Sequence, residues 1–268
     1  MAVIGTLRWR KLFWFEAVAT ILAVLSPCST TGFMRVGTNF RKPSVPTARP
    51  RGIPTSRNHC SKLPTLKMMG TFWQAMHSLS IFTARGLGEA VDFSRFRELL
   101  DVGGGSGAFD IELCTRYPNL SATVYDLPFV TGIAAEKIAE SGLSGRVTTH
   151  PGDFFADPKY PAGHDVILLS MIMHDWNEQE DRGILRKCYE ALAPGGAVVI
   201  SELLVNDEKT GPPPAALMSL NMLVETLGGR NYTPSEYRAW LEDTGFRDVK
   251  VIWFESAGAN GAVIGYKR

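Results

Sequence analysis

A glycine-rich run and one spaced aspartate are the residues of this sequence that most clearly predict a ligand. Gly103, Gly105 and Gly107 follow a β-rich run and open an amphipathic helical run. Glycines let the backbone turn sharply and approach a ligand closely, and a helix N-terminus offers free N–H groups. Asp126 ends the next β-rich run, at the distance where a carboxylate can accept both hydroxyls of a ribose. Together these features predict a ligand that contains adenosine, whereas a tight turn without a ligand is the plainer alternative.

The same glycine spacing also fits a dinucleotide, so other residues must decide between the two ligands. Asp101 stands at the tip of the strand before the loop, where it would repel a pyrophosphate but suit the ammonium and sulfonium groups of S-adenosylmethionine. Asp153 and Phe154 follow the third β-rich run and could place a carboxylate and a ring beside an adenine. No second strand–helix half suited to a nicotinamide is present, so we expect S-adenosylmethionine. The predicted cofactor-binding residues are Asp101, Gly103, Gly105, Asp126, Leu127, Asp153, Phe154 and Ser170.

Two further residues at the ends of β-rich runs could move a proton. His174 comes just past the fourth run, and Glu202 ends the fifth. Ligands of open α/β sheets gather at the carboxyl ends of the strands. A phenol has a pKa of about 10, so a histidine with a pKa near 7 is well matched to take its proton. Glu202 could hold one ring nitrogen protonated so that the other accepts. A capping histidine and a solvated strand-end acid are the structural alternatives.

The elements that must position these residues alternate in type along the chain. Short β-rich runs that alternate with amphipathic runs predict a parallel sheet with helices on both faces. Only Glu255–Gly261 joins the last two strands, so we expect a hairpin and an antiparallel last strand at or near an edge. The fold class is therefore α/β, a doubly wound, mostly parallel seven-stranded sheet. The predicted strands are 98–102, 121–125, 147–150, 166–170, 197–202, 249–254 and 262–266, and the predicted helices are 108–117, 130–141, 178–192, 215–227 and 234–243, with one or two more in 69–91.

The first quarter of the chain differs in composition from the rest. The whole chain has 268 residues and a formal net charge of +1, but residues 1–67 hold eleven Lys or Arg and a single acid, Glu16. Prolines spread through residues 43–64 argue against a packed domain there. We therefore expect a basic extension over 1–67, disordered or targeting, a helical lead-in over 68–96 and a methyltransferase-type domain over 97–268.

The localisation of the chain is left open by the extension. The apolar run Leu12–Leu25 follows basic residues as in a signal peptide, but it is short for a membrane span and contains an acid. The Arg-, Ser- and Pro-rich tract after it resembles a transit peptide, and an extension that never folds is the third reading. A cytoplasmic protein without a stable membrane span is the expectation, with a targeting peptide as the alternative.

Cysteines and charge predict neither a metal nor a nucleic acid as partner. The four cysteines form no CxxC pair, and no histidine lies at zinc-ligand spacing from them, so no metal site is expected. The basic tract contains no recognisable nucleic-acid-binding fold, and the rest of the chain is acidic. The expected partner is a small molecule that carries a hydroxyl group.

Six segments, taken in order, resemble a known family. LLDVGGGSGAF, VYDLP, GDFF, MHDW, APGGAVVISE and SLNMLVE are similar to segments of the plant-type and hydroxyindole O-methyltransferases, over about residues 70–268. The resemblance implies a class I methyltransferase fold, S-adenosylmethionine as donor and a small aromatic or polyketide hydroxyl as acceptor. It also implies that His174 is the catalytic base, that Asp175 stands beside it and that Glu202 orients it.

The sequence departs from this family in two places. The family's N-terminal helical domain, which dimerises and helps to wall the acceptor pocket, has no counterpart in residues 1–67, so a homodimer is possible but weakened. The family's second catalytic acid, in a GG-x-E-R-T stretch, is replaced here by Asn231, which can form hydrogen bonds but carries no charge. The predicted substrate-binding residues are Met222, Asn231 and Trp176.

The leading hypothesis is an S-adenosylmethionine-dependent O-methyltransferase acting on a small aromatic molecule with His174 as base. Methylation of carbon or nitrogen is one alternative, since Asn231 replaces an acid. An inactive or regulatory S-adenosylmethionine-binding domain is another, and a nicotinamide oxidoreductase is the most distant.

Overall fold

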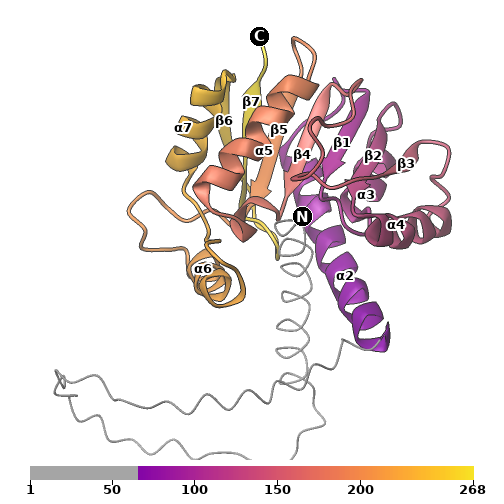
Figure 1. Ribbon diagram of the computed structural model, residues 1–268, viewed down its shortest axis with the longest axis horizontal. Coiled ribbons are helices and arrows are strands. Elements are labelled where there is room, and N and C mark those ends of the chain that lie inside the picture. The colour runs from indigo at the N-terminus through magenta and orange to yellow at the C-terminus, as the bar shows by residue number, and fades with distance from the viewer. Residues whose placement is uncertain (1–65) are drawn as a thin grey trace, which may run out of the picture. The chain divides into compact units, whose positions relative to one another are not determined.

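The structure is a computed structural model that describes residues 66–268 (Figure 1). The predictions for the basic extension and its targeting patterns fall on residues outside this range, apart from its last two positions, and the predicted domain boundaries remain predictions. The elements are α2 (Leu66–Ala90), β1 (Glu98–Val102), α3 (Ala108–Arg116), β2 (Ser121–Asp126), α4 (Pro128–Glu140), β3 (Val147–Pro151), β4 (Val166–Ser170), the 3-10 helix η1 (Met173–Asp175), α5 (Glu178–Ala191), β5 (Ala197–Glu202), α6 (Pro213–Glu225), α7 (Pro234–Thr244), β6 (Arg247–Trp253) and β7 (Gly261–Tyr266).

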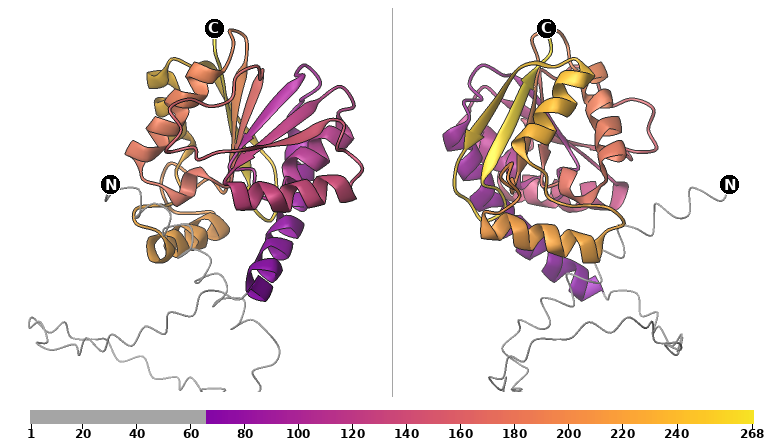
Figure 2. Two further views of the ribbon diagram at one scale, coloured as in Figure 1. Left: turned by 45° about the vertical axis from the view of Figure 1, so that its right-hand side comes forward. Right: turned by 90° about the vertical axis from the view of Figure 1, so that its left-hand side faces the viewer.

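The seven strands form one sheet in the order β3-β2-β1-β4-β5-β7-β6. The first five strands pair in parallel, whereas β7 is antiparallel to both of its neighbours and lies one strand in from the edge. This arrangement confirms the predicted doubly wound, mostly parallel sheet with an antiparallel last strand. Because β1, β2, β4 and β5 run in the same direction, the loops after them meet at one end of the sheet, beside which α6 lies (Figures 1 and 2).

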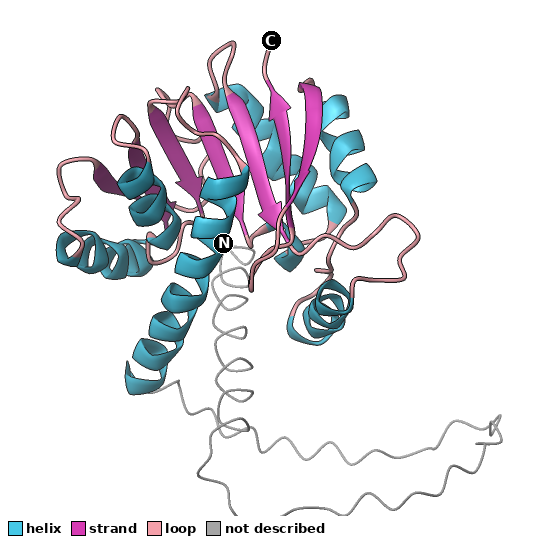
Figure 3. Ribbon diagram, turned by 180° about the vertical axis from the view of Figure 1, so that it is seen from behind, coloured by secondary structure: helices cyan, strands magenta, loops and turns pink. Residues whose placement is uncertain are grey.

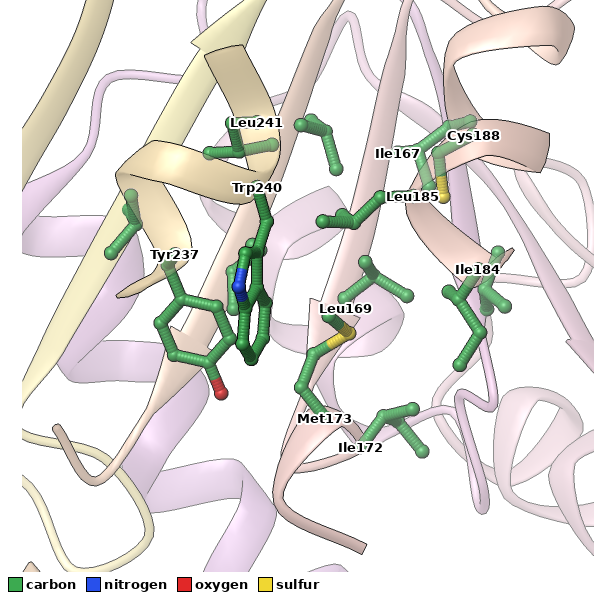
Figure 4. Packing of buried hydrophobic residues seen from close by; sticks show 14 of the residues in the cluster. Ile167, Leu169, Ile172, Met173, Ile184, Leu185, Cys188, Tyr237, Trp240 and Leu241 are labelled. Carbon is green, nitrogen blue, oxygen red and sulfur yellow. The ribbon is translucent and has the colours of Figure 1, made fainter. Parts of the chain in front are cut away.

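Each face of the sheet has its own hydrophobic core, because successive strand residues point to opposite faces. Leu100 and Ile167 belong to the core that α5 and α7 cover, whereas Leu99 and Val166 belong to the core that α3 and α4 cover together with the part of α2 from Trp73 onward. Figure 3 shows the C-terminal part of α2 in front of the strands, on the side opposite to that of α5 in Figure 1. In the first core, side chains of α5 and α7 meet those of β4 and η1 (Figure 4).

Local sequence sets where the helices begin. Asn177 and Glu180 form a capping box at the start of α5, and Thr233 and Glu236 form a second one at the start of α7. The helix α4 begins at Pro128, two residues before its predicted start, because proline is well accommodated at the first helical position. Between residues 66 and 268, no helix combines the length and the apolar character that crossing a membrane requires.

Candidate active site

The glycine loop after β1 is fixed to the end of β2 by one carboxylate. Gly103 and Gly105 have φ angles of 75° and 60°, in the left-handed region that favours glycine. The Asp126 carboxylate accepts a hydrogen bond from the Gly105 N–H at 3.0 Å and another from the Leu127 N–H at 2.7 Å. The structure thus brings together four of the predicted cofactor-binding residues, with Asp126 holding the loop in shape.

Two apolar side chains form a wall against this loop. A Cβ atom placed on Gly103 would lie 2.5 Å from Ile172 Cδ1 and 3.6 Å from Phe154 Cε1, so both side chains contact the loop at its first glycine. The Phe154 ring is buried and meets the Trp176 ring edge-on, with 6.0 Å between the ring centroids. Phe154 is one of the predicted cofactor-binding residues, and its contact with an adenine stays a prediction; Ile172 is not among the predicted residues.

Asp101 is buried beneath the loop rather than exposed at its rim. A Cβ atom on Gly104 would lie 2.7 Å from Asp101 Oδ2, so the loop passes directly over this carboxyl group. Asp110 of α3 is equally buried, and its carboxyl group lies close enough to that of Asp101 for the two to share a hydrogen bond when one of them is protonated. Apart from the backbone N–H of Asp110 itself, no N–H or hydroxyl group of the described residues donates to either one. A buried carboxyl pair without a donor or a cation fits the positively charged end of S-adenosylmethionine.

The remaining predicted cofactor residues lie at the ends of the next two parallel strands. Asp153 follows β3, and its Oδ1 accepts the N–H groups of Phe155 and Ala156 at 2.9 and 3.2 Å, so this oxygen shapes the local turn. Ser170 ends β4 with a buried hydroxyl that has no hydrogen-bond partner among the described residues. Neither placement tests the predicted contact with a cofactor, which stays a prediction for both residues.

A buried His–Glu pair lies after β4 and at the end of β5. His174 Nδ1 is 2.5 Å from Glu202 Oε2, and the other Glu202 oxygen accepts the N–H groups of Ile172 and Met173 at 2.9 and 3.0 Å. Because an ionised carboxylate only accepts, the Nδ1 atom carries hydrogen. Nε2 is 3.5 Å from Asp175 Oδ1. Glu202 therefore both orients the ring of His174 and holds the backbone of η1.

Strained backbone precedes the histidine. Met171 has a φ of 55°, which is rare for a residue with a side chain, and its N–H donates to the carbonyl oxygen of Ser201 at 3.0 Å. This left-handed residue turns the chain from the end of β4 into η1. Strain of this kind is found where surrounding contacts fix a functional geometry. Here those contacts come from Glu202 and from the neighbouring strand β5.

The charges around His174 favour its protonated form. Burial alone would lower the pKa of His174, but the negative charges of Glu202 and Asp175 and the hydrogen bond to Glu202 outweigh burial and raise the pKa to about 9. In the free protein at neutral pH, the ring therefore carries a proton on both nitrogens. It becomes a strong base once the Nε2 proton has left.

We expect the rate of methyl transfer to rise with pH. Below a pKa of about 9, the neutral fraction of His174 grows about tenfold per pH unit, so kcat/KM should climb from pH 7 to pH 8 and level off above pH 9. Initial rates across this range measure the effect. The matched variant is Glu202→Gln, which removes the charge that contributes most to raising the pKa of His174. In this variant the rise of kcat/KM with pH should begin at lower pH. A flat wild-type profile between pH 7 and pH 9 would contradict the assignment.

The residues predicted to bind the substrate surround η1 on several elements. Met222 is one of two buried residues of α6, a helix that contacts η1. Asn231 is buried, its amide nitrogen donates to the Leu203 carbonyl at 2.7 Å, and its Oδ1 has no hydrogen-bond partner among the described residues. The Trp176 carbonyl accepts the Tyr232 hydroxyl at 2.7 Å. Contact of these side chains with an acceptor stays a prediction.

Sequence reasoning missed three contributors to the site. Asp110 escaped notice although it is an acid on the inner face of the helix that the glycines open. The Nδ1 atom of His77 in α2 lies 2.8 Å from the hydroxyl oxygen of Ser106 in the glycine loop. Ile172 belongs to a short apolar run that reads as plain core. The pattern of residues offered a signal only for Asp110, as a charged group among the apolar positions of α3.

The close approach of Gly104 to Asp101 predicts opposite effects for two glycine substitutions. Gly104→Ala would force its Cβ against the buried carboxyl and should destabilise the fold by about 1–3 kcal/mol. Gly132→Ala, inside α4, meets nothing within 4 Å and should stabilise it by about 0.5–1 kcal/mol. Urea unfolding of both variants measures the two changes. Equal effects of the same sign would show that the loop does not press on Asp101.

A seven-stranded, mostly parallel sheet with β7 antiparallel, and a glycine loop with a spaced carboxylate at the carboxyl ends of its strands, are the architecture of class I S-adenosylmethionine-dependent methyltransferases. A family model described as an O-methyltransferase domain matches residues 59–247. The chain therefore belongs to the O-methyltransferase domain family, whose cofactor is S-adenosylmethionine. The family, the fold class and the cofactor predicted from the sequence are confirmed.

Three individual similarities bear on the site. The chain is 55% identical to 3-hydroxy-5-methyl-1-naphthoate 3-O-methyltransferase of Streptomyces sahachiroi over 74% of this chain and 56% of that protein. It is 35% identical to L-tyrosine C(3)-methyltransferase of Streptomyces lavendulae over 67% of this chain and 51% of that protein. The crystal structure of human N-acetylserotonin methyltransferase in complex with S-adenosylmethionine matches with a TM-score of 0.67 and 31% identity, over 75% of this chain and 56% of that one. The chain thus spans little more than half the length of these relatives.

Proposed function

We propose that this chain transfers the methyl group of S-adenosylmethionine to a hydroxyl group of a small aromatic molecule, with His174 as the general base. The observation that carries the proposal is the 2.5 Å contact between His174 and Glu202 at the end of the sheet that also holds the glycine loop. Such a pair is suited to removing a hydroxyl proton, which turns the hydroxyl oxygen into the stronger nucleophile that must stand in line with the sulfonium methyl group.

Each residue of the site has a distinct task in this reaction. S-adenosylmethionine, when bound, supplies an electrophilic methyl group, which leaves positioning and deprotonation to the protein. Asp126 and the glycine loop bind and orient the adenosine end. Nε2 of His174 accepts the hydroxyl proton of the acceptor, while Glu202 holds the Nδ1 hydrogen and stabilises the positive charge that the ring gains.

The surroundings of η1 and the naphthoate relative support an aromatic hydroxyl as the acceptor. Met222 is a flexible, polarisable side chain that adapts to flat ligands. The buried Oδ1 of Asn231 is able to accept a hydrogen bond from an acceptor hydroxyl. The relative whose name specifies methylation at the 3-oxygen of a hydroxynaphthoate has 55% identity to this chain. A bicyclic or monocyclic hydroxyarene with an acidic substituent is therefore the first acceptor to test.

Formation of S-adenosylhomocysteine tests the proposal. The full chain is incubated with S-adenosylmethionine and a panel of hydroxynaphthoates, hydroxybenzoates and hydroxyindoles, and S-adenosylhomocysteine is quantified by liquid chromatography. The proposal expects it to form only when a hydroxyarene is present. Binding of S-adenosylmethionine without turnover on any acceptor would favour the inactive or regulatory domain instead.

Methylation of an aromatic carbon is the second candidate, and two observations favour it. A relative of 35% identity is named as an L-tyrosine C(3)-methyltransferase. Asn231 stands where the family resemblance implies a second acid, so the proton-accepting capacity differs from that of the plant enzymes. Methylation ortho to a phenol also needs the hydroxyl proton removed, so His174 would have the same role, and the position of the methyl group in the product separates the two candidates.

A further inference from the structure

We propose that Asp101 and Asp110 form a proton-sharing carboxyl pair beneath the glycine loop, and that this pair releases its proton when S-adenosylmethionine binds. Asp110 is then a positioning residue for the cofactor, acting through Asp101. The inference rests on the proposed function, because it takes S-adenosylmethionine as the ligand of this loop.

The contact between the two carboxyl groups requires a proton. Asp101 is 1% exposed and Asp110 is fully buried, so neither reaches water. Their carboxyl groups lie within hydrogen-bonding range of each other, and two carboxylates this close in a buried place cannot both be ionised. One of them must therefore donate a hydrogen bond to the other in the protein without its cofactor.

No cation of the described residues compensates the pair. None of the ion pairs between residues 73 and 268 includes Asp101 or Asp110. In the sheet, Asp101 is in register with Val124 and Leu168, which are apolar. The charged or titratable groups nearby are the Asp126 carboxylate of β2 and the buried thiol of Cys114, one turn further along α3.

These surroundings keep the carboxyl pair protonated up to near-neutral pH. Burial raises the pKa of Asp110 to about 7, and burial followed by the negative charge of Asp110 holds the pKa of Asp101 well above its ordinary value. A positive charge brought to the pair favours its ionised form and lowers these pKa values. S-adenosylmethionine carries an ammonium and a sulfonium at its methionine end, and the loop that covers Asp101 is the one that binds the cofactor.

Linkage fixes the direction of the effect. A ligand that lowers the pKa of a group releases a proton where the free protein is protonated and the complex is not. In that window the affinity for the ligand rises by as much as about tenfold per pH unit. S-adenosylmethionine should therefore bind more tightly at pH 7 than at pH 6.

Titration calorimetry of the full chain with S-adenosylmethionine tests the inference. Measurements at pH 6.5 in phosphate and in imidazole, whose ionisation heats differ, give the number of protons released. We expect roughly one half to one proton per cofactor in the wild-type protein. In Asp110→Asn the side-chain amide can donate to the Asp101 carboxylate but has no titratable proton, so proton release should vanish and affinity should no longer depend on pH. Glu112→Gln on the same helix, at an exposed Arg85 ion pair, should behave as the wild type.

The possible outcomes separate this inference from the proposed function. Binding of S-adenosylmethionine without proton release in the wild type would overturn the inference of a shared proton, but it would support S-adenosylmethionine as the cofactor. Release that persists in Asp110→Asn but disappears in His174→Gln would overturn it too, because the proton would then come from the base. Absence of any binding would overturn both the inference and the proposed cofactor. The wild-type proton count decides the matter even if Asp110→Asn does not fold.

Discussion

Replacing His174 by glutamine should slow methyl transfer by about 10²–10⁴-fold, the range by which a positioned general base accelerates a reaction. The glutamine amide is able to donate to Glu202, so the buried carboxylate keeps a partner and the fold is preserved. It offers no basic nitrogen to the acceptor. Single-turnover rates measure the loss, and calorimetry should show that S-adenosylmethionine still binds.

A second histidine provides the control for this variant. His164 is half-buried and its Nδ1 lies 3.3 Å from the Pro161 carbonyl, away from the ends of the strands that form the site. His164→Gln should therefore leave the rate of transfer unchanged. A His174→Gln rate within tenfold of the wild type, with the fold intact, would mean that another group takes the proton or that the acceptor arrives already ionised.

Replacing Asp126 by alanine should weaken binding of S-adenosylmethionine by about 10²–10⁴-fold. Hydrogen bonds to a charged group contribute about 1.5–3 kcal/mol each, and the carboxylate is expected to accept two from the ribose. The substitution also frees the N–H groups of Gly105 and Leu127, which now hold the loop in its left-handed turn. Calorimetric titration with S-adenosylmethionine measures the loss of affinity.

Graded variants separate loss of the ligand contacts from loss of the fold. Asp126→Asn keeps one accepting oxygen without the charge and should weaken binding to an intermediate degree. Asp92→Ala removes an exposed carboxylate that accepts hydrogen bonds from Ser94, among them that of its N–H at 2.9 Å, and this variant should bind the cofactor as the wild type does. Wild-type affinity in Asp126→Ala, measured on folded protein, would exclude this carboxylate as the ribose partner.

The fold was predictable because its signals are local and repeated. The bounds of β1, β4 and β5 agree with those expected from their short apolar runs, and the hairpin followed from the short segment that joins β6 to β7. The predicted start of α4 was two residues too late, because an apolar pattern alone does not show that a proline such as Pro128 can occupy the first helical position.

The candidate site was predictable only as far as strand ends determine it. His174 and Glu202 follow neighbouring parallel strands, so the rule that ligands gather at the carboxyl ends predicted their proximity, and the structure pairs them. The contact between Asp101 and Asp110 depends on how α3 packs under the loop, which no spacing in the sequence expresses. The turn that uses Asp153 Oδ1 is likewise a consequence of tertiary placement.

A buried acid in α5, Asp181, also could not be explained from the sequence. Asp181 stands on the face of α5 that also carries Ile184, Leu185 and Cys188, and it is fully buried. Burial, followed by the negative charge of Glu202, holds the pKa of Asp181 well above its ordinary value. The helical period predicts an inward position for residue 181, but it gives no reason for a carboxyl group there.

The most direct test of the central claim is the position of a carbon-13 methyl group after reaction. The full chain is incubated with S-adenosylmethionine labelled at the methyl carbon and with a hydroxynaphthoate, and the product is examined by NMR. The account predicts a labelled methoxyl group on the aromatic ring, formed in wild-type protein and lost in His174→Gln. Bound cofactor with no labelled product, or a labelled methyl group equally abundant in wild type and His174→Gln, would contradict it.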